Sequence, residues 1–159
     1  MEIDFDKFKD VVARNCAEVP LELFNLTSVT GKSARDRIGE LNGYLGRFRE
    51  LYDYASLRWQ LQKNVTNDIE SMAIRELLDS PELKNKHGKI TATVIDAYKM
   101  SHVTDTNQTL ASETEILSYY EFALNRYKGM LLTIQATINS CQSMLAFDRT
   151  ELNSLNHVV

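Results

Sequence analysis

The sequence predicts an all-α protein built from long helices. Its 159 residues include only six glycines and two prolines, whereas an all-β fold needs a turn about every dozen residues. Two long segments also carry apolar residues at alternating spacings of three and four, the pattern of an amphipathic helix. We therefore expect a long helical hairpin with coiled-coil-like packing that assembles into oligomers.

Size and composition narrow the classes of protein to consider. A chain with 43% apolar and 25% charged residues is long enough to bury one core, which excludes a large multidomain enzyme and a wholly disordered chain. The net charge of -4 lacks the basic signature of a small duplex-binding domain. The first residues lack the basic segment of a signal peptide, and no apolar run approaches the roughly 18 residues of a membrane span. We expect a cytoplasmic protein with no membrane partner.

The N-terminal region, residues 1–31, is predicted to hold one helix and a connection. The helix is expected from about Asp4 to Glu18, and Pro20 is expected to close it. The stretch that follows is expected to be a connection or a short helical turn. The apolar residues that predict this helix are Phe5, Phe8, Val12 and Cys16.

Residues 32–78 are predicted to form one long basic and aromatic helix, with Ser33 as its N-cap. Three glycines, Gly39, Gly43 and Gly46, share one sector of it, and each weakens the helix by about 1 kcal/mol relative to alanine. Such a cost is tolerated more readily where tertiary packing holds the helix or another backbone comes close. The apolar series consists of Ile38, Leu41, Leu45, Phe48, Tyr52, Ala55, Trp59, Ile69, Ala73 and Leu77.

Two short segments are expected between the long helices. Residues 79–90 hold a proline, a glycine and a high density of charge, which predicts a loop. Residues 91–104 are predicted to contain a short helix that Thr91 caps, although Thr93 and Val94 keep a strand as the alternative.

Residues 105–148 are predicted to form a second long helix, beginning near Thr109, with a tail at 149–159. Its apolar stripe runs over four heptads and needs a long partner. We expect that partner to be the first long helix folding back or the same helix of another subunit. The stripe predicted to drive oligomerisation consists of Leu117, Tyr120, Leu124, Tyr127, Leu131, Ile134, Ile138 and Leu145.

Motifs for catalysis, metals and cofactors are absent from the sequence, so we expect a protein that is not an enzyme and needs no metal or cofactor. The run from Thr30 to Ser33 ends like a phosphate-binding loop, but Leu26 stands where that loop needs its first glycine. The three histidines stand singly, without metal-ligand spacing. Glu113 and Glu115 project in different directions from a helix, and we interpret them as a solvated face.

Two basic islands interrupt the acidic chain, and the first, residues 31–63, holds seven cations against four acids. Arginines interleaved with aromatic residues suit phosphate contact and base stacking on single-stranded nucleic acid. In the alternative, the aromatic residues belong to the core and the arginines are solvated or paired with Glu50 and Asp53. The lysines of residues 84–89 compete for the DNA-binding role. The candidate DNA-binding residues are Arg35, Arg37, Arg47, Arg49, Arg58, Lys63, Lys84, Lys86 and Lys89.

Two segments carry patterns that a known protein family shares. Residues 58–63 read Arg-x-x-x-Gln-Lys, and a short segment that opens with Lys-Ile-Thr stands between two long helices. The residues that carry the similarity are Tyr119, Leu124, Gly129, Leu131, Ile134, Arg58, Gln62 and Lys63.

Through these residues the chain resembles the UvsY-like family of phage recombination mediators. Residues 119–134 resemble, without gaps, the C-terminal helix of that family, residues 58–63 look like its Arg-x-x-x-Gln-Lys stretch, and the parts stand in the same order. The similarity covers about residues 26–148. If a phage encodes the chain, the cytoplasm expected above is that of the host.

The resemblance implies an all-helical subunit that forms a ring-like oligomer through its C-terminal helix and binds single-stranded DNA. It also implies a role in helping a RecA-type recombinase displace single-strand-binding protein. One departure concerns the short Lys-x-Arg element of the family, because acidic Asp68 and Glu70 stand at that place here. Either the DNA surface has moved to the upstream arginines and the 84–89 lysines, or mediation uses protein contacts, or the resemblance is only architectural.

The sequence thus leads to two functional hypotheses. The first is a non-enzymatic recombination mediator, in which several weak DNA sites on one oligomer act together on one strand at high effective concentration. The alternative is a coiled-coil adaptor or assembly chaperone that does not bind DNA.

Overall fold

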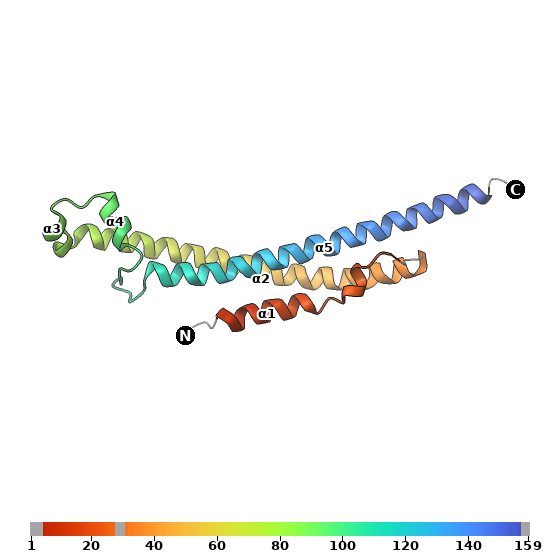
Figure 1. Ribbon diagram of the computed structural model, residues 1–159, viewed down its shortest axis with the longest axis horizontal. Helices are drawn as coiled ribbons and strands as arrows, with labels where there is room; N and C mark the ends of the chain where they lie inside the picture. The colour runs from red at the N-terminus through yellow and green to blue at the C-terminus, as the bar shows by residue number, and fades with distance from the viewer. Residues whose placement is uncertain (1–4, 28–30, 157–159) are drawn as a thin grey trace. The chain divides into compact units, whose positions relative to one another are not determined.

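The structure is a computed structural model that describes residues 5–27 and 31–156, with side chains described for 5–27 and 33–151. The described residues form helices and contain no strand, only an isolated bridge between Val103 and Thr109. The all-α prediction is therefore confirmed (Figure 1). The elements are α1 (Phe5–Ala17), the 3-10 turn η1 (Leu21–Phe24), α2 (Gly31–Asp79), α3 (Pro81–His87), α4 (Ala92–Tyr98) and α5 (Leu110–Asn156).

The predicted helices at 4–18 and 32–78 correspond to α1 and α2, and their ends agree with the prediction to within about one residue. The expected start of the first helix, Asp4, lies outside the described residues. The second long helix differs more at its C-terminal end. It starts at Leu110, next to the expected start near Thr109, and continues to Asn156 through most of the predicted tail. The chain holds no glycine or proline after Gly129, so nothing local ends the helix at residue 148.

Part of the predicted loop at 79–90 is helical instead. Ser80 caps α3 by accepting a hydrogen bond from the backbone N–H of Leu83 at 3.4 Å, and Pro81 fits the first turn, where its missing N–H is not needed. Gly88 ends the helix with a φ of 67°, a conformation that glycine adopts without strain. Residues 92–98 form α4, so the helical alternative holds there.

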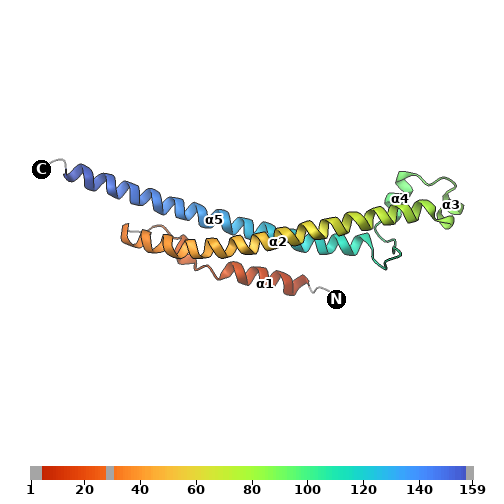
Figure 2. The same ribbon diagram turned by 180° about the vertical axis from the view of Figure 1, so that it is seen from behind.

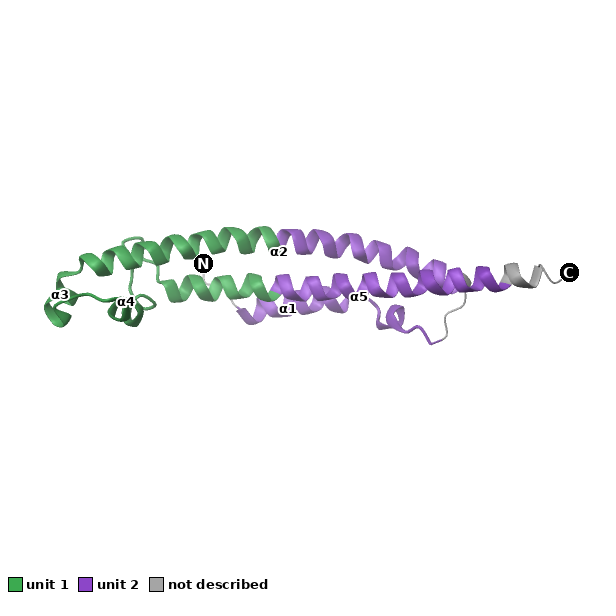
Figure 3. Ribbon diagram, turned by 90° about the horizontal axis from the view of Figure 1, so that it is seen from above, with its two compact units in different colours: residues 1–3, 55–122 green, residues 4–54, 123–159 purple. Residues whose placement is uncertain are grey.

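The helices form two compact units, which are described separately (Figure 3). The described part of unit 1 is residues 55–122: the C-terminal part of α2, α3, α4 and the first turns of α5. In this unit the α2 and α5 segments pack side by side, and the apolar series of α2 continues to Leu77. The buried apolar side chains of unit 1 are Ala55, Ile69, Ala73, Leu77, Leu83, Leu110 and Tyr119.

Unit 2 brings α1, the N-terminal part of α2 and the C-terminal part of α5 together (Figures 1 and 2). The Phe48 and Tyr127 rings lie 6.0 Å apart in an edge-to-face arrangement, and the Asn15 side chain donates to the Tyr127 hydroxyl at 3.0 Å. Burial of this phenol raises the pKa of Tyr127. The buried apolar side chains of unit 2 are Val12, Val19, Leu23, Ala34, Leu41, Leu45, Phe48, Ala123, Tyr127, Ile134, Ile138 and Cys141.

Candidate nucleic-acid interface

Two of the predicted DNA-binding arginines make side-chain contacts within unit 2. Arg37 donates through Nη1 to the carbonyl oxygens of Leu23 and Asn25, so it ties the connection after α1 to α2. Arg47 forms an ion pair with Glu18, just beyond the end of α1. Both side chains therefore have intramolecular roles, and an exposed ion pair of this kind contributes little stability by itself.

Arg35 and Arg49 are exposed on the same helix. Within the described residues, neither side chain makes a hydrogen bond or an ion pair. Arg58 and Lys63 are also exposed, in the part of α2 that belongs to unit 1. The Lys63 ammonium lies 4.8 Å from the centre of the Trp59 ring, a cation–π distance, so this lysine already covers the aromatic face nearest to it.

The lysines of residues 84–89 form a second basic group, at the end of α3 in unit 1. Lys84, Lys86 and His87 stand in the last turn of the helix, where positive charge is favourable because the unpaired carbonyls carry a partial negative charge. Lys89 follows directly after Gly88. All four basic side chains are exposed.

An aromatic residue of α4 packs against this group. The Lys86 ammonium donates to the Tyr98 hydroxyl at 3.0 Å and lies 5.5 Å from the centre of its ring. The His87 ring meets the Tyr98 ring at 6.0 Å in an edge-to-face arrangement. The hydrogen bond from Lys86 to Tyr98 raises the pKa of Lys86 and keeps the ammonium charged. We call Lys84, Lys86, His87, Lys89 and Tyr98 the α3 basic cluster.

Tyr98 was not among the predicted site residues. Its own helix, α4, holds no basic residue, and only the packing of α4 brings it to the end of α3. Lys99, its neighbour, is basic but lies between two carboxylates, with Glu70 at 3.1 Å and Asp96 at 3.0 Å. Those two partners, Asp96 first, raise the pKa of Lys99 and offset its charge.

The interpretation of Glu113 as part of a solvated face is wrong. Its side chain is only 6% exposed and accepts hydrogen bonds from the amides of Gln62 at 2.7 Å and Gln108 at 3.2 Å. Glu113 stands in the first turn of α5, where the helix N-terminus favours a carboxylate. Because that turn faces α2, the carboxylate lies inside unit 1. Gln62, one of the residues behind the family resemblance, is thus engaged within the chain.

The acidic residues at the departure from the family pattern differ from each other. Glu70 accepts a hydrogen bond from Lys99 at 3.1 Å, so it joins α2 to the end of α4. Asp68 is exposed on α2. Both residues are acidic, so they cannot replace the cations of the Lys-x-Arg element. The basic candidates for DNA contact in unit 1 besides Lys63 are therefore Arg58 and the α3 basic cluster.

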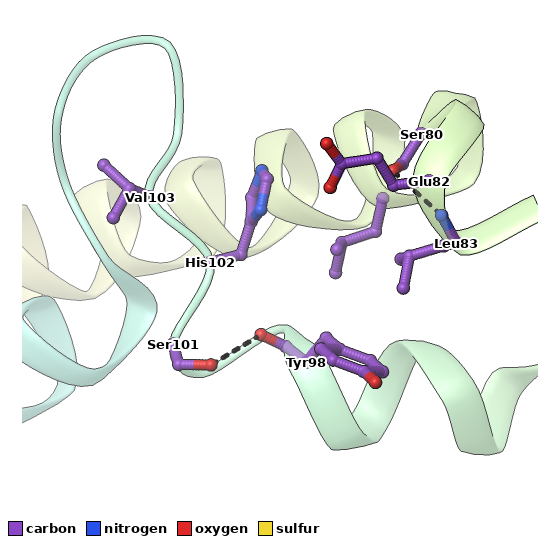
Figure 4. A pocket seen from close by; sticks show the side chains of 8 residues that line it. Ser80, Glu82, Leu83, Tyr98, Ser101, His102 and Val103 are labelled. Atoms are coloured by element: carbon purple, nitrogen blue, oxygen red, sulfur yellow. Dashed lines mark hydrogen bonds between the residues drawn. The ribbon is translucent and has the colours of Figure 1, made fainter. Parts of the chain in front are cut away.

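A pocket of about 340 Å³ lies beside the α3 basic cluster, between the end of α2, α3, α4 and the loop that follows (Figure 4). Its apolar lining includes Leu77, Leu83 and Val103, and the Tyr98 side chain also lines it. At its edge, His102 Nε2 lies 2.7 Å from Glu76 Oε2. The backbone N–H of Asp105 also donates to the Glu76 carboxylate, so Glu76 joins this loop to α2. The two hydrogen bonds, that of His102 first, lower the pKa of Glu76.

The predicted oligomerisation stripe of α5 is covered unevenly within the chain. Tyr127, Ile134 and Ile138 are buried in unit 2, so these three side chains are not available to another subunit unless the unit opens. Self-association through α5 stays a prediction. The half-buried members of the stripe are Leu117, Tyr120, Leu124, Leu131 and Leu145.

Residues 5–27 and 31–156 contain no group of three or more histidine, cysteine or acidic side chains placed to hold a metal ion. In the same ranges, no helix combines the length and the apolar character that crossing a bilayer requires.

Comparison with known proteins found no matching family model, no similar curated protein and no similar solved structure.

Proposed function

We propose that this protein is a non-enzymatic accessory factor that binds single-stranded DNA and helps a RecA-type recombinase replace single-strand-binding protein. The observation that carries the DNA-binding part is the α3 basic cluster, where Lys86 and His87 contact Tyr98 and the exposed Lys84 and Lys89 stand close by in the chain. Cations that contact phosphates, combined with an aromatic ring that a base can stack on, are the two elements of sequence-tolerant single-strand binding. The recombination part rests on the resemblance of residues 58–63 and 119–134 to the mediator family.

The α3 basic cluster suits a flexible single strand better than a duplex. The side chains of Lys84 and Lys89 are exposed and make no hydrogen bond or ion pair within the described residues, so phosphate contacts do not compete with internal ones. Duplex reading needs an element that enters a groove, whereas a single strand needs only phosphate contacts and stacking. A patch of this size binds weakly, and linkage of several copies in a homo-oligomer would raise its effective affinity.

The test is single-strand affinity as a function of salt for two matched double variants. Lys84→Glu with Lys89→Glu changes the cluster, and Lys128→Glu with Arg149→Glu makes the same charge change on the exposed surface of α5. We expect the first variant to weaken binding to all sequences alike and to reduce the salt slope by roughly 0.7 for each phosphate that the protein no longer neutralises. Tyr98→Ala should weaken binding with little change in slope, because stacking releases no counterions.

The control should bind as the wild type does. Equal losses of affinity in the two double variants would mean that net charge alone sets the affinity. A wild-type protein that binds no single strand at low salt would refute the proposal.

For the recombinase step, filament assembly on DNA coated with single-strand-binding protein should start sooner with the wild type than with the Lys84 and Lys89 variant.

A different observation supports the adaptor alternative. The exposed face of α2 in unit 1 carries Leu57, Leu61 and Val65, which are more typical of a protein contact than of a DNA contact. A chain that binds no DNA in the experiment above but forms a stable complex through this face would be an adaptor.

A further inference from the structure

Three large apolar side chains of α2 in unit 1 form an exposed stripe. Leu57, Leu61 and Val65 are 54%, 50% and 39% exposed, and they recur every four residues, so they lie in one row along the helix. The buried residues of this stretch, such as Ile69 and Ala73, face the interior of unit 1. The stripe therefore lies outside the packing that unit 1 makes with its own helices.

Charged residues of opposite sign lie along this stripe. Arg58 precedes Val65 by seven residues and Asp68 follows Leu61 by seven, so heptad spacing places both along the same row. Both side chains are exposed. The positive charge stands next to Leu57 at the N-terminal end of the stripe, and the negative charge stands three residues beyond Val65, so only Leu61 and Val65 lie between the two.

We propose that this stripe is the surface through which two copies of the chain associate, with their α2 helices antiparallel about a twofold axis at Leu61. In this register Leu61 meets Leu61 of the partner subunit, and Leu57 meets Val65 of the partner subunit. A twofold contact uses the same patch on both chains, which requires a self-complementary surface. The stripe meets that requirement because its apolar residues are symmetric about Leu61.

The two charges determine the direction of the pairing. In the antiparallel register, Arg58 lies about one helical turn, roughly 5.4 Å along the axis, from Asp68 of the partner subunit, which an arginine side chain can span. Symmetry produces two such pairs. A parallel pairing would instead bring Arg58 near Arg58 and Asp68 near Asp68, and like charges disfavour that arrangement. The inference does not rest on DNA binding, and it uses a surface separate from the α5 stripe.

The first test is the oligomeric state by sedimentation equilibrium over a range of protein concentration. Leu61→Glu should raise the dissociation constant of the dimer about tenfold or more, because it places two carboxylates at the centre of the contact. Leu132→Glu on α5 is the matched control, since Leu132 is 63% exposed outside the stripe. Circular dichroism should show both variants folded. A monomeric wild type, or a Leu61→Glu variant that associates as the wild type does, would overturn the inference.

Charge reversal tests the direction of pairing. Arg58→Asp and Asp68→Arg should each weaken the dimer, and the double variant should restore it, because the exchange recreates both opposite-charge pairs. In a parallel dimer the double variant would only reproduce the like-charge contacts of the wild type, and neither single reversal would remove a favourable pair. Failure of the double variant to regain affinity would contradict the antiparallel register.

Cross-linking tests the position of the axis. Leu61→Cys should form a disulfide-linked dimer on mild oxidation, because the two residues 61 face each other across the axis. Leu57→Cys alone should not, since its opposite residue is Val65 of the partner subunit. The wild type measures the background from Cys16 and Cys141. Equal cross-linking of the two cysteine variants would refute an axis at Leu61.

Discussion

The side-chain amide of Gln62 on α2 donates to the buried carboxylate of Glu113 on α5 at 2.7 Å. The Thr66 hydroxyl lies 3.3 Å from the backbone oxygen of Glu113, so a second α2 residue contacts the same turn. A buried carboxylate without a cationic partner depends on such donors. This contact fixes which residues of α2 and α5 lie opposite each other in unit 1.

Loss of the Gln62 amide should therefore destabilise the fold. Gln62→Leu leaves one oxygen of a buried carboxylate without its donor, and we expect a cost of about 1–3 kcal/mol in the free energy of unfolding. Chemical denaturation of this variant and of Gln60→Leu, at an exposed position of the same helix, measures the difference. A double-mutant cycle with Glu113→Gln should show strong coupling, and simple additivity would contradict a direct interaction.

Arg37 should be needed to hold the connection between α1 and α2. Arg37→Ala removes the donor that serves the carbonyls of Leu23 and Asn25, so η1 should open more often. Hydrogen exchange of residues 21–25 should become faster, while the core of unit 2 stays protected. Arg35→Ala, two residues away and exposed, is the control, and an equal effect of both variants would rule out a specific role for Arg37.

Glu76 should contribute a pH-dependent part of the stability. The hydrogen bonds from His102 and from the backbone N–H of residue 105 hold the pKa of Glu76 below its ordinary value of 4.5. A carboxylate with a lowered pKa stabilises the fold above its ordinary pKa, and this stability disappears as the pH falls through the lowered value. Glu76→Gln should therefore lower Tm at neutral pH.

The difference in Tm should shrink toward zero in acid, below the lowered pKa. Glu121→Gln, at an exposed position in the interior of α5, provides the comparison and should have nearly the same Tm as the wild type throughout. A Glu76→Gln deficit that stays constant across the acidic range would show that the carboxylate charge is not its cause.

Ile134 should stabilise the fold of a single chain, whether or not the protein forms oligomers. Its side chain is fully buried within unit 2, so Ile134→Ala should cost about 2–5 kcal/mol. Leu132→Ala, on the exposed side of the same helix, should change stability by less than about 0.5 kcal/mol. An Ile134→Ala variant that is monomeric and as stable as the wild type would place Ile134 in a subunit contact after all.

The helical pattern alone predicted the long elements well, because long apolar series at spacings of three and four have few alternative structures. Leu41, Leu45 and Phe48 are buried as the series of α2 requires. The short helix α3 was missed, although Ser80, Pro81 and Gly88 are its N-cap, first-turn and C-terminal signals. The high charge between these residues outweighed the caps in the prediction of a loop.

The candidate site was less predictable, because sequence spacing shows which residues share a helix face but not what lies opposite. Arg37 and Arg47 share the basic composition of Arg35 and Arg49, and only the folded connection and the end of α1 distinguish them. Glu113 was assigned to solvent for the same reason. The contact between Tyr98 and Lys86 joins two short helices, and no periodic pattern encodes it.

The three glycines of α2 affect how this helix responds to thermal fluctuation. A Cβ atom added at Gly39, Gly43 or Gly46 would meet nothing within 4 Å, so no described neighbour requires a glycine there. Each glycine lowers the helical propensity of its segment, and packing of residues such as Leu41 and Leu45 holds the segment in place. Transient loss of that packing would thus melt this stretch sooner than the glycine-free part of α2, which makes it the natural starting point of unfolding along the helix.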